Sequence, residues 1–183
     1  MMRAVCVLLL ALSVHTADGD GLLGYYRQPA LHGKTIVFHA EGDLWKVSAN
    51  GGTAQRLTTH LERERFPVIS PDGETVAFTA SYEGPTEIYT MPLAGGRPTR
   101  VTYDGASGRR TPYAVDWKSP TELVYATWFD SQRDTMQLAV KDLASGESSL
   151  LPLAQASDGV FAPDQKTVYF TCLLYTSPSP RDS

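Results

Sequence analysis

Cysteine is nearly absent from this sequence. The 183 residues contain two, Cys6 and Cys172, and both lie close to the ends of the chain. The long central part therefore has no pair of thiols from which to form a disulfide, and no cysteine nucleophile. A disulfide-stapled fold and thiol chemistry are both excluded there.

Positive charge is also in short supply. Lysine and arginine total 16 against 20 aspartate and glutamate residues, which gives a formal net charge of −4. A protein that binds nucleic acid needs a basic surface to neutralise phosphates. We therefore expect no nucleic-acid partner.

Long apolar runs are missing except near the start. Residues 4–14 (AVCVLLLALSV) form an uninterrupted apolar stretch after Arg3. The stretch is too short to cross a bilayer comfortably, and its build is typical of a secretory leader. The sequence predicts a signal peptide over residues 1–17, a periplasmic or secreted protein, and no stable membrane anchor. A buried first helix or strand is the alternative interpretation.

The other end of the chain carries an unusual segment. Residues 172–182 read CLLYTSPSPRD, which is what a transposase-based sequencing adapter gives when it is translated in frame. We interpret residues 172–183 as non-native sequence, exclude them from fold reasoning, and expect the gene product to continue beyond Thr171. A native tail rich in proline and serine is the alternative.

What the chain does contain is a repeated unit, clearest over residues 66–102. The unit divides into four short strands, predicted over 66–70, 75–79, 87–92 and 98–102. Asp72-Gly73 and Gly95-Gly96 separate strands of this unit, and tight hairpin turns need the positive φ that glycine adopts without steric cost. The pattern predicts a strand, turn, strand arrangement.

Copies of this unit recur along the chain. The aromatic residue of its second strand returns at steps of 40, 47 and 45 residues, at Phe38, Phe78, Tyr125 and Phe170. Such a period is typical of β-propeller blades, and roughly four to eight blades close a ring. We predict an all-β chain: a truncated, partial β-propeller over residues 29–171, after a lead-in segment over 18–28. It comprises about three blades of four antiparallel strands and the start of a fourth.

Two resemblances follow from these motifs. The blade unit, which recurs with its period, resembles the PD40 or TolB-type repeat of WD40-like propellers, whose Ser-Pro-Asp-Gly turn stands here at residues 70–73. Residues 24–104, including GYYRQPALHGKTIVFHAEGDLW, further resemble the start of bacterial tricorn protease homologues of serine peptidase family S41. That second resemblance implies a propeller followed, much later in the chain, by a PDZ module and a serine peptidase domain.

Residues for catalysis are not evident in this chain. The G-x-S-x-G elbow of a serine hydrolase is missing. His32, His39 and His60 are scattered and lack the spacing of metal ligands, so we interpret them as surface or strand-end residues. We predict no catalytic residue, no cofactor and no metal site here.

Binding is expected instead at the loops that join the second and third strands of a blade. Loops at one end of a propeller carry binding residues more often than its strands do. The candidates are Tyr82 and Glu83 in one blade and Trp128 and Arg133 in the next.

Three other features of the chain have structural interpretations. The charged run at residues 61–65 (LERER) is interpreted as a solvated connector between blades. Trp45 and Trp117 fall on strand positions of the repeat, where aromatic rings pack between blades. We assign both tryptophans to the core.

Three functions remain open from the sequence. In the first, the chain is the propeller of an exported tricorn-like serine protease, where it selects peptide or protein substrates; a homo-oligomer of the full-length protein is compatible with this. In the second, it is a non-enzymatic, TolB-like periplasmic scaffold that holds protein partners. In the third, the propeller precedes another hydrolase, of prolyl-oligopeptidase or amidohydrolase type.

Overall fold

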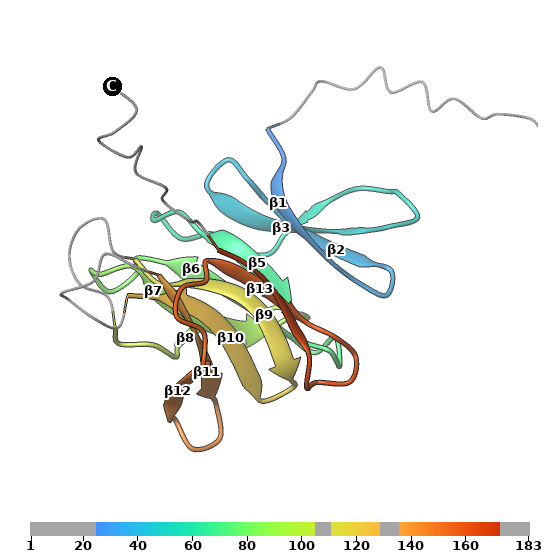
Figure 1. Ribbon diagram of the computed structural model, residues 1–183. Helices are drawn as coiled ribbons and strands as arrows, with labels where there is room; N and C mark the ends of the chain where they lie inside the picture. The colour runs from blue at the N-terminus through green and yellow to red at the C-terminus, as the bar shows by residue number, and fades with distance from the viewer. Residues whose placement is uncertain (1–24, 105–110, 129–135, 173–183) are drawn as a thin grey trace, which may run out of the picture.

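The described part of the chain is built from β-strands. The computed structural model describes residues 25–104, 111–128 and 136–172 (Figure 1). Blade 1 consists of β1 (Arg27–His32), β2 (Thr35–Ala40), β3 (Asp43–Ser48) and β4 (Gln55–Arg56). Blade 2 consists of β5 (Arg65–Ile69), β6 (Thr75–Ala80), β7 (Glu87–Pro92) and β8 (Thr99–Arg100). Blade 3 consists of β9 (Tyr113–Ser119), β10 (Glu122–Thr127), β11 (Gln137–Asp142) and β12 (Ser148–Leu150). Blade 4 contains β13 (Asp158–Phe161) and β14 (Val168–Thr171).

Each blade is an antiparallel sheet whose strands lie in chain order. The predicted partial propeller, with three four-stranded blades and the beginning of a fourth, is confirmed. The strand predicted over 87–92 matches β7, whereas the one predicted over 98–102 shortens to the two residues of β8. The first strand, β1, begins at Arg27, so blade 1 includes the end of the lead-in segment. No helix that could cross a membrane occurs in the described ranges.

The turn at residues 70–73 is held by its own side chains. Asp72 Oδ1 accepts hydrogen bonds from Ser70 Oγ at 2.5 Å and from the Glu74 N–H at 3.0 Å. Gly73 supplies the positive φ, +74°, that closes the turn. These two hydrogen bonds hold the pKa of Asp72 below its usual value, and the bond from Ser70 has the larger effect. The Ser-Pro-Asp-Gly sequence thus builds a self-contained turn with an ionised aspartate.

The hydrophobic core lies between blades rather than within them. Alternate residues of β6 point to opposite faces, so Val76 and Phe78 pack toward blade 1 while Ala77 packs toward blade 3. Trp117 is 4% exposed and donates its indole N–H to Val68 O at 3.1 Å, which joins blade 3 to blade 2. Its assignment to the core is therefore confirmed. Trp45 is only half-buried.

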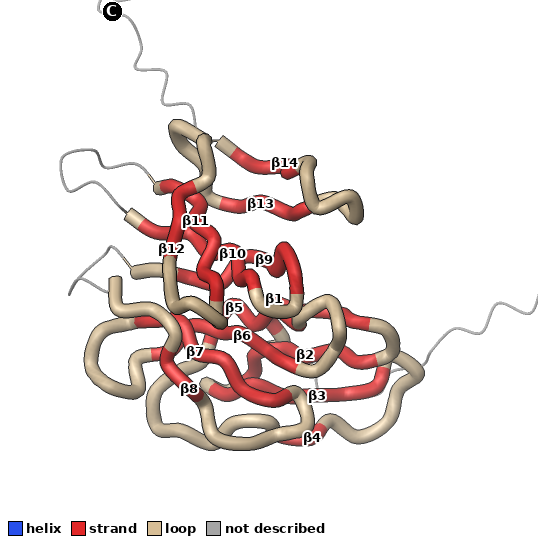
Figure 2. Tube along the Cα trace, turned by 90° about the horizontal axis from the view of Figure 1, so that it is seen from below, coloured by secondary structure: helices blue, strands red, loops and turns tan. Residues whose placement is uncertain are grey.

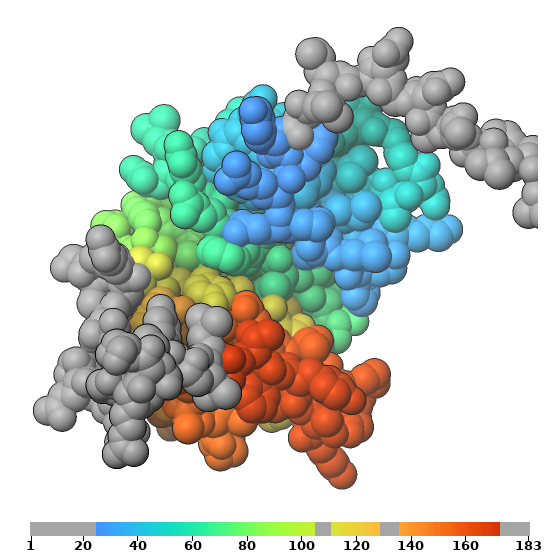
Figure 3. Space-filling model, turned by 45° about the horizontal axis from the view of Figure 1, so that its top comes forward, coloured from blue at the N-terminus to red at the C-terminus, as the bar shows by residue number. Residues whose placement is uncertain are grey.

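The first strands of successive blades lie side by side. β1 contacts β5, β5 contacts β9, and β9 contacts β13. The sheets consequently fan out from a common inner edge (Figure 2), and they follow one another in chain order across the surface from blue to red (Figure 3). This arrangement places residues that are far apart in sequence around one central space.

Candidate functional site

The central space is a hollow of about 470 Å³, which we call the inner hollow. Its walls come from the first strands of all four blades and from β14. The lining includes Gln28, Pro29, Phe66, Pro67, Val68, Tyr113, Ala114, Val115, Asp158, Gly159, Val160, Tyr169, Phe170 and Thr171. Most of these side chains are apolar or aromatic. The hollow therefore has a largely apolar wall.

Two β-bulges shape the entrance to this hollow. The pairing of β1 with β2 shifts register after Arg27, and the pairing of β5 with β6 shifts after Arg65. At both bulges the next residue, Gln28 or Phe66, has a positive φ, at 51° and 52°. A non-glycine residue in this conformation is uncommon, and bulges redirect side chains near binding sites. The repeated Arg-x-Pro sequence at 27–29 and 65–67 is the signal that could have revealed them.

A chain of contacts then runs from blade to blade along the wall. Gln28 Oε1 accepts a hydrogen bond from the Phe66 N–H at 3.0 Å. The Phe66 ring stacks on Tyr113 with 4.8 Å between centroids, and the Tyr113 hydroxyl donates to Ser157 O at 2.6 Å. Burial, and secondarily the charge of Asp158, raises the pKa of Tyr113 to about 12. Each blade is thus tied to the next at the inner hollow.

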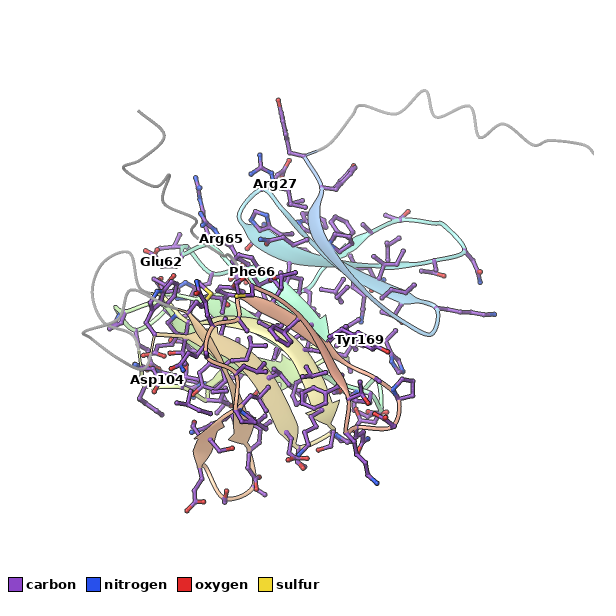
Figure 4. The ribbon with its side chains drawn as sticks, in the orientation of Figure 1. Arg27, Glu62, Arg65, Phe66, Asp104 and Tyr169 are labelled. Carbon is purple, nitrogen blue, oxygen red and sulfur yellow. The ribbon has the colours of Figure 1, made fainter. Side chains whose placement is uncertain are left out.

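The edge of the hollow at blades 1 and 2 is basic. Arg27, Arg65 and Phe66 lie together where the two blades meet (Figure 4). Burial lowers the pKa of His39, and the positive charges of Arg65, Arg27 and Arg63 lower it further. Arg27, Arg63 and Arg65 are all exposed, and their charges disfavour protonation of the His39 imidazole.

A second hollow of about 410 Å³ lies between blades 1 and 2, and we call it the Tyr82 pocket. It is lined by residues 57–60, Tyr82, Glu83, Tyr89, Met91 and residues 96–98, none of which lines the inner hollow. The structure thus places the predicted residues Tyr82 and Glu83 at one hollow. Trp128 is half-buried and lines neither hollow, and Arg133 lies outside the described residues.

The interpretation of residues 61–65 as a solvated connector is wrong for Glu64. Leu61, Glu62, Arg63 and Arg65 are exposed, but Glu64 is fully buried. Its carboxylate accepts hydrogen bonds from Tyr82 Oη at 2.5 Å and Thr58 Oγ1 at 3.0 Å. Burial raises the pKa of Glu64. The connector is therefore anchored by one of its charged residues.

A repeated polar clamp explains why Glu64 is buried. In blade 2, Glu87 accepts hydrogen bonds from Arg100 at 2.8 Å and from Thr102 Oγ1 at 2.5 Å. In blade 1, Asp43 pairs with Arg56, but the equivalent threonine, Thr58, donates to Glu64 instead. Aspartate is one methylene shorter than glutamate, so the carboxylate of Asp43 does not reach Thr58. Glu64 supplies the carboxylate that accepts the hydrogen bond from Thr58 instead. The signals for this clamp are the sequences Arg-Leu-Thr at 56–58 and Arg-Val-Thr at 100–102.

The histidines are not gathered at one site. His60 is exposed and packs on the Tyr82 ring with 4.0 Å between centroids, whereas the His32 ring lies where a Cβ added to Gly73 would meet it. Within the described residues, no group of three histidine, cysteine or acidic side chains could hold a metal ion. The linings of both hollows consist mainly of aromatic, apolar and hydrogen-bonding groups.

Known sequences resemble this chain over most of its length. Residues 23–178 match the family described as the tricorn protease N-terminal beta propeller domain. Tricorn protease homolog 1 of Streptomyces coelicolor is 38% identical over 82 residues, which is 45% of this chain and 8% of that protein. The tricorn protease homolog of Saccharolobus solfataricus is 30% identical over 145 residues, 76% of this chain and 13% of that protein. The chain thus spans a small fraction of the length of these relatives.

Solved structures show the same fold. The structure of a putative TolB from Agrobacterium tumefaciens superposes with a TM-score of 0.69 at 23% identity, over 81% of this chain and 54% of the other. The crystal structure of the tricorn protease gives 0.65 at 21% identity, over 78% and 15%. Together with the inner hollow and the repeated blades, the family match settles the assignment. The chain belongs to the family of tricorn protease N-terminal β-propeller domains.

Proposed function

We propose that this chain is the amino-terminal propeller of a longer, exported serine protease of the tricorn type. In this proposal the propeller admits unfolded polypeptide, and the chemistry belongs to another part of the protein. The tricorn relatives and the leader-like sequence of residues 1–17 support it. The observation that carries the proposal is the inner hollow, which gathers walls from four blades around one apolar space.

The dimensions and chemistry of the inner hollow suit an unfolded chain. A space of about 470 Å³ has room for a short extended segment with its side chains. The rings of Phe66, Tyr113 and Tyr169 offer large apolar surfaces. Unfolded polypeptides can pack against them, because they expose the apolar side chains that folded proteins bury. Selection between unfolded and folded substrates would then follow from the apolar surface that only unfolded chains expose.

A TolB-like scaffold is the second candidate. The superposition on a putative TolB covers 81% of this chain, and it shows that both kinds of protein share the fold. In this candidate the same hollow holds a segment of a partner protein, and no peptidase follows the propeller. The two functions predict different occupants, namely many unfolded sequences in the first and one specific partner in the second.

A photocrosslinking experiment tests the proposed occupant. The photoreactive amino acid p-benzoylphenylalanine replaces Phe66 in the inner hollow or, as the control, Tyr103, which is 73% exposed and lines neither hollow. The probe is reduced and carboxymethylated α-lactalbumin, with the native protein for comparison. We expect crosslinks from position 66 to the unfolded probe alone. Equal crosslinking from both positions, or to both forms of the probe, would contradict the proposal.

A further inference from the structure

Three arginines gather at the edge of the inner hollow. Arg27 comes from β1, Arg63 from the connector between blades 1 and 2, and Arg65 from β5. All three are exposed, and the charges of all three act on the same imidazole, that of His39. Arg27 and Arg65 lie together beside Phe66, which lines the hollow (Figure 4). We call these three residues the arginine cluster.

No acidic side chain neutralises the arginine cluster. Within the described residues, none of its three guanidinium groups forms an ion pair or a side-chain hydrogen bond. The arginines of the two polar clamps, Arg56 and Arg100, are by contrast paired with carboxylates. Like charges that lie close together repel one another, and a bound anion relieves that repulsion. The cluster therefore presents unused donors and an unbalanced positive charge at the hollow.

The strand pairing shows how the cluster is placed around the hollow. In each blade, one residue of the first strand pairs with the residue that follows the recurring aromatic of the second strand. These equivalent residues are Arg27, Arg65, Tyr113 and Asp158 in blades 1 to 4. Asp158 is the only acidic residue in the lining that the structure describes. A ligand at this end of the hollow thus meets guanidinium groups on blades 1 and 2 and a single carboxylate on blade 4.

An acidic polypeptide segment fits the cluster and the hollow together. The planar guanidinium group of arginine can donate two parallel hydrogen bonds to one carboxylate. The apolar wall beside the cluster can pack against a neighbouring aromatic or aliphatic side chain of the same segment. A nucleic acid fits less well, because its many phosphates would also meet Asp158 and a chain of net charge −4.

We propose that the arginine cluster selects, among the unfolded polypeptides that reach the inner hollow, segments with aspartate or glutamate beside an apolar residue. Carboxylates of the segment pair with Arg27 and Arg65 while the apolar side chain packs against Phe66. This inference rests on the proposed function, because it requires that polypeptide enters the hollow. It adds to that function a preference for acidic segments, which the aromatic wall alone does not supply.

The test is fluorescence anisotropy of rhodamine-labelled peptides titrated with the 183-residue chain. The peptides are Ser-Glu-Phe-Glu-Ser and its counterparts with glutamine or lysine in place of both glutamates. All are amidated at the carboxyl end, so they differ only in two side chains. We expect the glutamate peptide to bind about fivefold more tightly than the glutamine peptide, and the lysine peptide to bind most weakly. Raising sodium chloride from about 0.02 M to about 0.5 M should remove this preference, because salt screens exposed charges.

The double variant Arg27→Gln/Arg65→Gln makes the test specific. Both residues are exposed, so the variant should fold, and it should bind the glutamate and glutamine peptides equally. Lys34→Gln/Lys166→Gln is the matched control, because it removes the same charge from exposed residues that line neither hollow. The control should keep the preference of the parent chain.

The outcomes separate this inference from the proposed function. Equal binding of the glutamate and glutamine peptides by the parent chain would overturn the acidic preference alone, since the glutamine peptide would still occupy the hollow. A preference that survives Arg27→Gln/Arg65→Gln, or that the control loses equally, would overturn the assignment to the arginine cluster. Failure of all three peptides to bind would overturn both this inference and the proposed admission of polypeptide.

Discussion

Replacement of Arg100 by alanine should destabilise blade 2 strongly. The side chain of Arg100 is 15% exposed, and that of its partner Glu87 is fully buried. Arg100 donates to Glu87 at 2.8 Å and, through Nε, to Thr102 O at 2.9 Å. It also lies over the Tyr103 ring, 4.5 Å from the centroid. Arg100→Ala would remove all three interactions while leaving the buried carboxylate in place.

The expected loss follows from the asymmetry of buried ion pairs. Removal of one partner from such a pair typically costs about 3–5 kcal/mol, because the remaining charge stays desolvated. Glu87 keeps the hydroxyl of Thr102 and the N–H of Asp104, so the lower end of this range applies. The contact of Arg100 with Glu83, which is 64% exposed, adds little. We therefore expect a loss of about 3 kcal/mol in the free energy of unfolding.

Urea denaturation followed by tryptophan fluorescence measures this loss. Arg97→Ala is the matched control, because Arg97 is exposed and no ion pair with it occurs among the described residues. It should change the free energy of unfolding by less than about 0.5 kcal/mol. In the Arg100→Ala background, Glu87→Gln should restore about 1–2 kcal/mol, since it removes the buried charge. An Arg100→Ala variant as stable as Arg97→Ala would refute this account of the clamp.

Three further predictions concern blade contacts. Gly159→Ala places a Cβ 2.6 Å from Leu138 Cδ1, so overpacking should reduce the free energy of unfolding by about 1–3 kcal/mol in the same urea assay. The pKa of Glu64 lies above its ordinary value of 4.5, so the fold favours the protonated form and loses that stability as pH rises through the raised pKa. Glu64→Gln should therefore gain stability relative to the parent as pH increases above 4.5, and a parallel pair of pH profiles would contradict this. Asp116 Oδ2 accepts a hydrogen bond from the Phe161 N–H at 2.9 Å, which links blade 3 to blade 4. Asp116→Ala should therefore accelerate hydrogen exchange of the Phe161 amide. Unchanged protection of this amide would exclude the link.

The blades could be predicted because their signals are local and repeated. Asp72-Gly73 and Gly95-Gly96 mark turns that the structure contains, with φ of +74° at Gly73 and +106° at Gly95. Strand β7 was predictable to the residue, since Pro-Thr precedes it and Leu-Ala-Gly-Gly follows it. The recurrence of an aromatic residue once per blade then indicated a propeller, because each blade buries the same face against a neighbour.

The sites were only partly predictable because they depend on contacts between blades. Tyr82 and Glu83 could be nominated from their loop, but the burial of Tyr89, which lines the same pocket, follows from packing against blade 1. Glu64 reads as part of a solvated charge run, since nothing local shows that Thr58 and Tyr82 converge on it. A charged residue becomes buried when distant donors surround it, and a linear pattern does not record such donors.

The inner hollow was missed for the same reason. Its wall joins Gln28 to Phe66, and Phe66 to Tyr113, across separations that span whole blades. The Arg-x-Pro repeats would have drawn attention to the bulges, although not to the space they border. Only the side-by-side packing of β1, β5, β9 and β13 brings these residues together.

Sequencing the gene past the codon for Thr171, by long reads that use no transposase adapter, tests the central claim most directly. The claim is that this chain is the propeller of a tricorn-like protease. We predict that the reading frame continues through further blades into a PDZ module and a serine peptidase domain, and that CLLYTSPSPRDS is not encoded. A frame that ends soon after the last blade, or that encodes residues 172–183 as they stand, would contradict the account.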